Sequence, residues 1–303
     1  MYNEKDVWHD WLTRDLHQNE GELVRLQNQR IINSFAQKAI DNACLKENQL
    51  IIDAGSGEGT VSFLAIEQVG SSLRTVLIDI SQQLLNLSKD TAKSKGVISQ
   101  CEFIKAPMDS MTMIADNSVD RIITRASLAY VDNKINTLKE FLRVLKPGGM
   151  ISLAEPIFQD AAMNVAIQKK MIDLQIKKLG SADRDKVLIH RWQSTQFPDD
   201  IEDINNIPFI NFTERDLVTW SQESGFTNIH MEFHIDEIKL EYNNWTSLLN
   251  SSMHPLAPKL SEVLKNNFSE AEADELRELL IPGNTFNTAL AKTHMAYLTA
   301  HKP

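Results

Sequence analysis

The chain is poor in glycine and cysteine, and it has fewer basic than acidic side chains. Only 11 of its 303 residues are glycine, about half the roughly 7% that is usual. Its two cysteines, Cys44 and Cys101, lie far apart. This excludes a disulfide framework or a zinc site of close-spaced thiols, and favours a reducing cytoplasm. With 31 basic against 41 acidic residues, the net charge of −10 argues against a general electrostatic grip on nucleic acid.

Long apolar runs are also absent. No segment approaches the ~20 apolar residues of a membrane span, and residues 1–22 lack the apolar core of a signal peptide. We therefore expect neither a membrane partner nor a targeting segment in this sequence. The hydrophobic content of 42% and charged content of 24% are those of an ordinary globular domain.

Short apolar runs alternate with helical patterns through the first half of the chain. The runs predict strands at residues 50–52, 74–79, 101–105, 119–124 and 150–154. Ser81 is expected to cap one intervening helix, and Lys146-Pro147-Gly148-Gly149 to form a turn after another. This alternation is typical of βαβ units, and it predicts an α/β, Rossmann-like parallel sheet with helices on both faces.

The flanking segments follow other patterns. Apolar residues recur at helical spacing in residues 3–47 and again after Pro156. We expect a helix at 160–180, an irregular, lid-like stretch at 183–212, a helix at 213–224, a strand at 228–239 and a mainly helical segment at 245–282. The last segment, 290–301, is either a strand or a helix, because periodicity alone leaves both open.

Three of the scarce glycines fall within five residues. They belong to the loop Asp53-Ala54-Gly55-Ser56-Gly57-Glu58-Gly59, between a predicted strand and a predicted helix. Glycines let a backbone turn tightly and approach a ligand closely. Asp79 ends the next strand, where a carboxylate can accept hydrogen bonds from both ribose hydroxyls of a nucleoside. The acids Asp53 and Glu58 beside the loop oppose a pyrophosphate but suit a ligand with an ammonium or sulfonium group.

This loop, followed by Asp79, resembles that of the class I S-adenosylmethionine-dependent methyltransferases, over roughly residues 49–155. The 146–149 turn and the run Asp116-Asn117-Ser118-Val119-Asp120 before the fourth strand are further marks of the family. The resemblance implies S-adenosyl-L-methionine as cofactor and a seven-stranded, mostly parallel sheet, one of whose last two strands is antiparallel. It divides the chain into an N-terminal helical cap (1–48), a cofactor-binding core (49–155), a lid or acceptor insertion (156–212), a continuation of the core (213–244), a helical insertion (245–288) and a final core strand (289–303). The whole chain looks like a broad group of bacterial small-molecule methyltransferases.

The resemblance also implies which residues contact the cofactor. They are Asp53, Ala54, Gly55, Ser56, Gly57, Gly59, Asp79, Ile80, Met108, Asp109 and Arg125. One position departs from the family pattern, because many members carry Asp-Ala after the third strand, where this chain has Ala106-Pro107-Met108-Asp109. The carboxylate for the adenine amino group then has to come from Asp109, and Met108 supplies backbone contacts or covers the ring.

The acceptor residues are expected at the carboxyl ends of the strands, where ligands of such sheets bind. We predict Glu155, His190 and Tyr130 as catalytic residues. The acceptor-binding set is Trp8, Trp11, Arg125, Tyr130, Glu155, Arg191 and Trp192. The structural alternatives are an ion pair for Arg125, a hydrogen-bonded lid residue for His190 and packing anchors for the two tryptophans. No metal site is expected.

These features predict in-line methyl transfer to a small molecule, with oxygen as the first choice of acceptor atom. The alternatives are N- or S-methylation of an amino-acid-like substrate such as a thioether, a cofactor-binding module without catalysis, and a nicotinamide-dependent oxidoreductase. Nucleic-acid bases are disfavoured, because residues 124–130 lack the Asn/Asp-Pro-Pro-aromatic turn that holds an exocyclic amine. The sequence leaves a homodimer open.

Overall fold

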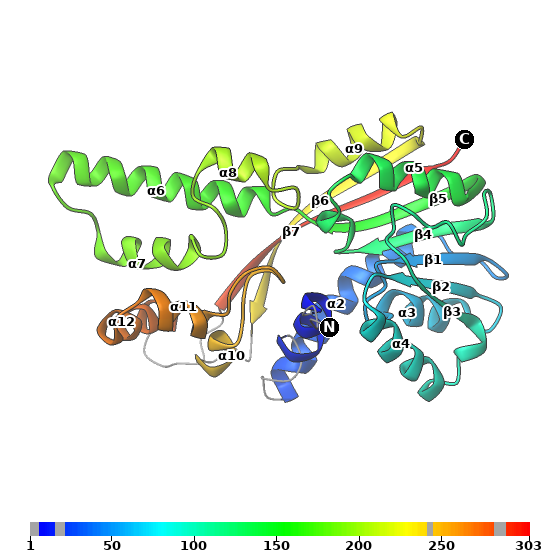
Figure 1. Cartoon of the computed structure of the whole chain (residues 1–303), viewed down its shortest axis with the longest axis horizontal. Helices are drawn as coiled ribbons and strands as arrows, with labels where there is room; N and C mark the ends of the chain where they lie inside the picture. The colour runs from blue at the N-terminus through cyan, green and yellow to red at the C-terminus, as the bar shows by residue number, and fades with distance from the viewer. Residues whose placement is uncertain (1–5, 16–21, 241–244, 282–288) are drawn as a thin grey trace, which may run out of the picture.

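The computed structural model describes residues 6–15, 22–240, 245–281 and 289–303. Its centre is a seven-stranded sheet in the order β3-β2-β1-β4-β5-β7-β6 (Figure 1). The strands are β1 (Leu50–Ala54), β2 (Arg74–Asp79), β3 (Cys101–Lys105), β4 (Val119–Arg125), β5 (Leu145–Pro156), β6 (Thr227–Leu240) and β7 (Ala289–His301). The pairs that involve β7 are antiparallel and the others are parallel. The predicted Rossmann-like sheet is confirmed, and the last segment is a strand.

Helices surround the sheet and extend beyond it. The N-terminal ones are α1 (Val7–Asp10), the π-helix η1 (Trp11–Asp15) and α2 (Glu22–Asn42). The core contains α3 (Thr60–Val69), α4 (Gln82–Ser94), the 3-10 helices η2 (Ile98–Gln100) and η3 (Leu128–Tyr130), α5 (Lys134–Val144) and α9 (Glu214–Glu223). The insertions contain α6 (Gln159–Leu179), α7 (Arg184–Gln193), α8 (Ile201–Asn206), α10 (Trp245–Leu249), α11 (Leu260–Asn267) and α12 (Glu270–Leu280). None of the helices in these described segments is long and apolar enough to cross a bilayer.

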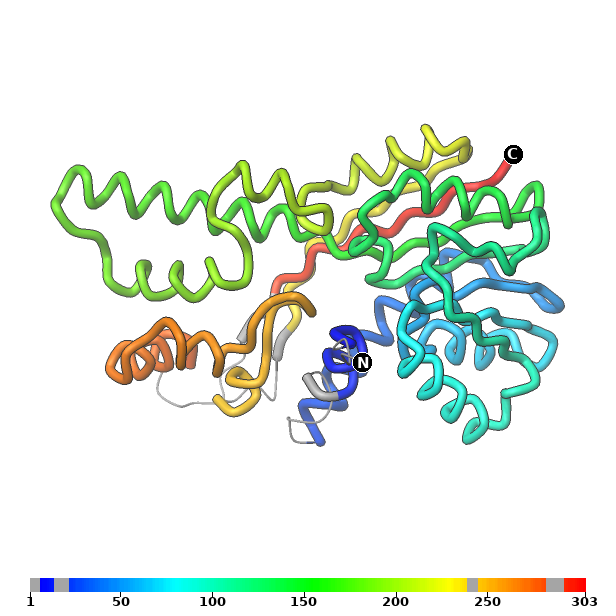
Figure 2. Tube along the Cα trace, in the orientation of Figure 1, coloured from blue at the N-terminus to red at the C-terminus, as the bar shows by residue number. Residues whose placement is uncertain are grey.

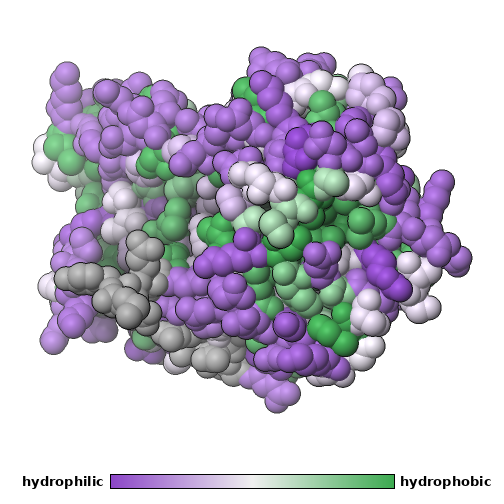
Figure 3. Space-filling view, turned by 45° about the vertical axis from the view of Figure 1, so that its right-hand side comes forward, coloured by the Kyte–Doolittle hydropathy of each residue, from purple (hydrophilic) through white to green (hydrophobic). Residues whose placement is uncertain are grey.

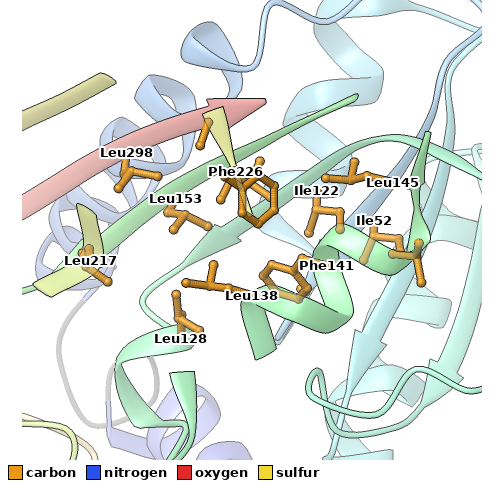
Figure 4. Packing of buried hydrophobic residues seen from close by; sticks show 14 of the residues in the cluster. Ile52, Ile122, Leu128, Leu138, Phe141, Leu145, Leu153, Leu217, Phe226 and Leu298 are labelled. Carbon is orange, nitrogen blue, oxygen red and sulfur yellow. The ribbon is translucent and has the colours of Figure 1, made fainter. Parts of the chain in front are cut away.

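Two apolar layers hold the helices to the sheet. Because side chains alternate along a strand, Ile51 of β1 packs toward α2 and α3 while Ile52 packs toward α5 and α9. Figure 4 shows Leu138 and Phe141 of α5 pointing at Ile122 on the sheet. Burying each such side chain contributes about 1.5–3 kcal/mol. These layers align the carboxyl ends of β1, β2, β4 and β5 along one edge.

The insertions form an arm beside that edge. In Figures 1 and 2, α6 to α8 and α10 to α12 lie away from the sheet, next to the long β6–β7 hairpin. The irregular stretch predicted at 183–212 is wrong in part, since it contains α7 and α8. Asp183 caps α7 and Asp200 caps α8, and each helix buries an apolar residue, Leu188 and Ile204 respectively. The capping aspartates are the acids that suggested a loop.

The predicted turn at 146–149 is part of β5 instead. Gly148 N donates to Lys302 O at 3.0 Å, and Lys302 N donates to Gly149 O at 2.8 Å. The C-terminal end of the chain therefore continues the strand pairing through this segment. The predicted Ser81 cap is confirmed, since its hydroxyl accepts from Leu84 N at 3.1 Å.

Candidate functional site

A cavity of about 1130 Å³ opens at the carboxyl edge of the sheet and continues under the arm. It exceeds the roughly 300–1,000 Å³ of a pocket for one small molecule. One part, the loop end, is lined by residues that include Gly55, Gly57, Asp79, Ile80, 106–109 and Arg125. The other, the aromatic end, is lined by residues that include Tyr130, Phe158, Phe197, His254 and 292–295. Hydrophobic side chains also gather in the middle of the face in Figure 3, bordered by hydrophilic ones.

The glycine loop is tied to β2 by its own backbone. Gly55 N and Ser56 N donate to Ile78 O at 2.8 and 3.0 Å, and Gly57 N donates to Asp79 Oδ2 at 2.8 Å. Gly55 has φ +70°, and a Cβ there would lie 2.4 Å from Ser127 Cβ. Only glycine therefore allows β4 to approach the loop this closely. The same hydrogen bonds leave these N–H groups unavailable to phosphate oxygens.

Asp79 presents a carboxylate to the loop end. Besides Gly57 N, it accepts from Ser81 N at 2.8 Å, and burial raises its pKa. Each carboxylate oxygen keeps lone-pair capacity for a further donor. Beside it, Ile80 is 52% exposed and lines the cavity together with Met108. A polar anchor next to apolar walls suits a nucleoside, whose sugar is polar and whose base is flat.

Four predicted cofactor residues support the loop without lining the cavity: Asp53, Ala54, Ser56 and Gly59. The buried Asp53 carboxylate accepts from Ser62 N at 3.0 Å and from Ser62 Oγ at 2.9 Å. Desolvation raises its pKa to about 6. Asp53 therefore joins the end of β1 to the first turn of α3. The other seven predicted cofactor residues line the cavity.

Glu155, predicted as catalytic, is fully buried and is not among the cavity-lining residues. Its carboxylate accepts from Thr124 Oγ1, and from Ser127 N and Ala129 N at 3.0 Å each. Burial raises its pKa. These bonds hold the turn after β4, in which Ala126 adopts φ +50°. Glu155 is thus placed to orient the turn rather than to touch an acceptor.

Arg125 and Tyr130 follow that turn and do line the cavity. The Arg125 guanidinium makes no hydrogen bond or ion pair with any residue that the structure describes. Burial lowers its pKa, while the charges of Glu58 and Asp53 oppose that change. Burial likewise raises the pKa of Tyr130, so its hydroxyl stays protonated at neutral pH. This half-buried cation can receive an anionic group of a ligand.

The aromatic end is assembled from segments far apart in the chain. The Tyr130 ring lies 5.0 Å from Trp8, 6.2 Å from Phe158 and 5.6 Å from Phe209, measured between centroids. Trp11 lines the cavity next to Trp8, as predicted for an acceptor-side helix. Sequence reasoning missed the other contributors, because their only signal was aromatic character. They are Phe158, Phe197, Phe209 and His254.

His254 is a wall of this end rather than a proton acceptor. Its Nε2 lies 2.6 Å from Gln196 O, and its Nδ1 accepts from Leu256 N at 3.3 Å. Both ring nitrogens are therefore engaged. Burial lowers the pKa of His254, which keeps the ring neutral.

Three predicted site residues, His190, Arg191 and Trp192, are not brought to the cavity lining. His190 Nε2 lies 3.3 Å from Asp199 Oδ2. Arg191 donates to Glu272 Oε1 at 3.1 Å and stacks 4.1 Å from the ring centroid of Phe268. Trp192 packs against the apolar cluster of α7, α11 and α12. Their contacts fasten α7 to α11 and α12, which explains why this polar and aromatic run faces away from the cavity.

Comparisons with known proteins agree with this geometry. Residues 45–206, more than half of the chain, match the family described as methyltransferase domain. A ubiquinone/menaquinone biosynthesis C-methyltransferase, UbiE, of Haemophilus ducreyi is 30% identical over 122 residues, which are 39% of this chain and 47% of that protein. The chain thus spans about half the length of the curated relatives that it matches.

Solved structures share the fold at low sequence identity. The YcgJ protein of Bacillus subtilis superposes with a TM-score of 0.56 at 14% identity, over 89% of this chain and 98% of that one. A geranyl diphosphate C-methyltransferase of Streptomyces coelicolor, solved with S-adenosyl-L-homocysteine, gives 0.51 at 13% identity, over 91% and 81%. With the family match, the glycine loop and Asp79 at the edge of the seven-stranded sheet, the chain belongs to the class I S-adenosylmethionine-dependent methyltransferases.

Proposed function

We propose that the protein transfers a methyl group from S-adenosylmethionine to a small molecule bound at the aromatic end. The observation that carries this proposal is the single cavity of about 1130 Å³, which joins the loop end to the aromatic end. Methyl transfer is an in-line displacement, so donor and acceptor must share one enclosed space with their reacting atoms aligned. The activated donor supplies the methyl group, and the chain's own residues bind and orient both partners.

At the loop end, Asp79 binds the ribose hydroxyls, and Ile80 and Met108 cover the base. Asp109 lies at the exposed rim, where it can accept from the adenine amino group. Arg125 takes a carboxylate, either that of the cofactor or that of the acceptor. Acidic side chains around the loop complement a sulfonium.

The acceptor end favours an apolar or aromatic molecule that carries no positive charge. Among the described residues that line the cavity, the carboxylates are Asp79 and Asp109, both at the loop end. An ammonium at the aromatic end would therefore lack a counter-ion among these residues. Oxygen is our first choice of acceptor atom. Carbon is the second candidate, because the Haemophilus ducreyi relative is a C-methyltransferase.

The nicotinamide alternative has less support. A pyrophosphate needs free N–H groups at the glycine loop, whereas Gly55, Ser56 and Gly57 donate theirs within the protein. A thioether acceptor and a module without catalysis are separated from the main proposal by experiment.

Isothermal titration with S-adenosylmethionine, S-adenosylhomocysteine and NAD tests the cofactor. Transfer of a labelled methyl group to a panel of phenols, thioethers, amines and electron-rich ring carbons tests the reaction. We expect binding of both sulfur nucleosides and transfer to a phenol or ring carbon. Tighter binding of NAD contradicts the cofactor, and binding without turnover on any acceptor favours a module.

A further inference from the structure

An imidazole and a carboxylate meet at the cavity where β7 passes α6. His294 Nδ1 lies 3.0 Å from Asp160 Oδ2. The His294 side chain is 18% exposed and lines the cavity, whereas Asp160 stands behind it in the first turn of α6. The pair is invisible in the sequence, because the two residues belong to different insertions.

The surroundings hold this imidazole in place. Ile157 N donates to His294 O at 2.9 Å, which joins β7 to the residue that follows β5. The ring of Phe233 on β6 packs edge-on against the imidazole, with centroids 6.2 Å apart. The only other charged groups packed near it are Lys292 and Glu237, which lie 3.6 Å from one another on β7 and β6 of the described hairpin. Asp160 is thus the carboxylate in contact with the ring.

His294 also differs from the other histidines of the described chain. Of these, only His254 and His294 line the cavity, and His254 uses both ring nitrogens within the protein. In His294 the carboxylate stands at Nδ1, and Nε2 has no hydrogen-bond partner among the described residues. A carboxylate at Nδ1 favours the tautomer that carries its proton there and leaves Nε2 as a base.

We propose that His294, oriented by Asp160, is the general base that removes the proton of an acceptor hydroxyl; this rests on the methyl transfer proposed above. The hydroxyl proton passes to Nε2 as an oxygen lone pair forms the new bond to the methyl carbon. The carbon–sulfur bond breaks, and its electron pair returns to sulfur. The products are the methyl ether, S-adenosylhomocysteine and an imidazolium, which then releases its proton to water.

The assignment narrows the substrate class. An acceptor that needs a base carries its proton on the atom to be methylated, as a phenol or enol does, whereas a thioether has none to lose. The absence of a carboxylate lining the aromatic end, within the described residues, agrees with an acceptor that becomes an anion.

The test replaces His294 by Gln and uses His230→Gln as the matched control. His230 lies on the same hairpin, but its side chain is 70% exposed and does not line the cavity. With 4-methylphenol as acceptor we expect His294→Gln to lose roughly 10²–10⁴-fold in kcat/KM, with S-adenosylhomocysteine affinity within twofold of wild type. The acidic limb of the pH profile, where an imidazole gains its proton, should vanish. Asp160→Asn should lose less and shift that limb. Methyl transfer to a thioether should be unaffected.

A second readout needs no turnover. 4-Nitrophenol absorbs differently as phenol and phenolate, so its ionisation can be followed in the complex with S-adenosylhomocysteine. We expect the wild type and His230→Gln to ionise the bound probe at lower pH than water does, and His294→Gln to lose this effect. An effect that His294→Gln retains in full, or its absence from the wild type, overturns the proposal.

The two proposals fail differently. If the wild type methylates a phenol and His294→Gln does so equally at every pH, only the base is wrong. If the wild type transfers no methyl group to any acceptor although it binds the cofactor, the proposed function is wrong, and the nitrophenol titration still decides whether His294 takes a proton.

Discussion

The loop end and the aromatic end of the cavity are built in different ways. At the loop end, hydrogen bonds connect residues close in the sequence, such as Asp53 with Ser62 and Gly57 with Asp79. At the aromatic end, rings from an N-terminal helix, the turn after β4 and the insertions meet around Tyr130. The first arrangement is rigid and polar, and the second is apolar and assembled from distant segments. The difference suits a constant cofactor at one end and a variable acceptor at the other.

The arm also has a smaller core than the sheet. In α3 five residues are buried within ten positions, whereas the 21 residues of α6 bury two, Ala162 and Val165. Met171, Leu174 and Leu179 on its second half are exposed. Segments with few buried apolar contacts open at lower free energy. We therefore expect substitutions at the loop end to cost more than matched ones in the arm.

The largest expected effect is that of Gly55→Ala. The new Cβ would lie 2.4 Å from Ser127 Cβ, at φ +70°. Overpacking costs about 1–3 kcal/mol and a left-handed non-glycine residue about 1–2 kcal/mol more. We expect a loss of about 3 kcal/mol in urea unfolding and no measurable S-adenosylhomocysteine binding by calorimetry.

The control for this change is Gly180→Ala at the end of α6. Gly180 has φ +78°, but nothing lies within 4 Å of its Cβ position. It should lose only about 1–2 kcal/mol and keep full affinity. Equal losses in the two variants would mean that backbone strain, and not the approach of Ser127, makes glycine necessary in the loop.

The second prediction concerns pH. The pKa of Asp53 is about 6 in the fold and 3.8 when exposed. Between about pH 4 and 6 the unfolded chain has already released this proton and the folded chain has not. Asp53 therefore stabilises the fold below this range, and its contribution is lost as pH rises. Relative to Asp53→Asn, the wild type should lose about 3 kcal/mol across this window in urea unfolding.

A carboxylate in the arm should behave in the opposite way. Hydrogen bonds from Arg191 lower the pKa of Glu272 to about 2. Its contribution is present above the ordinary value of 4.5 and is lost as pH falls toward 2. Glu272→Gln should therefore reduce the acid sensitivity of unfolding below pH 4.5, and leave the slope at higher pH unchanged. A difference between Asp53→Asn and wild type that is constant from pH 4 to 7 would contradict the burial argument.

How much the sequence could predict follows the same division. The loop and Asp79 were predictable because a strand, a glycine turn, a helix and an acid follow one another within a short segment. The role of Glu155 was not, because only the structure shows that its carboxylate accepts backbone N–H groups of the turn after β4. The contact between His294 and Asp160 depends on β7 returning beside β5 and α6. Long-range packing decides such pairs, and no local pattern encodes it.

The third prediction compares two carboxylates at the loop end. Asp79→Asn can accept only one of the two N–H groups that Asp79 now accepts, from Gly57 and Ser81. A hydrogen bond to a charged group contributes about 1.5–3 kcal/mol, so we expect S-adenosylhomocysteine affinity to fall roughly 10- to 100-fold in calorimetry. Asp109→Asn is the control, because Asp109 is exposed and an amide oxygen can still accept at that position. A larger effect at Asp109 would place the main anchor at the adenine.

The smallest effects should come from the residues that fasten α7 to α12. His190→Gln and Arg191→Gln change side chains outside the cavity lining, so cofactor affinity and kcat should stay within about twofold of wild type. Arg191→Gln removes a partly exposed ion pair with Glu272 and should cost about 1 kcal/mol or less in urea unfolding. The sequence suggested His190 as a catalytic base, and this variant decides that question. A tenfold fall in kcat for His190→Gln with unchanged cofactor affinity would mean that α7 moves its histidine into the cavity during turnover, and the arm would then take part in catalysis.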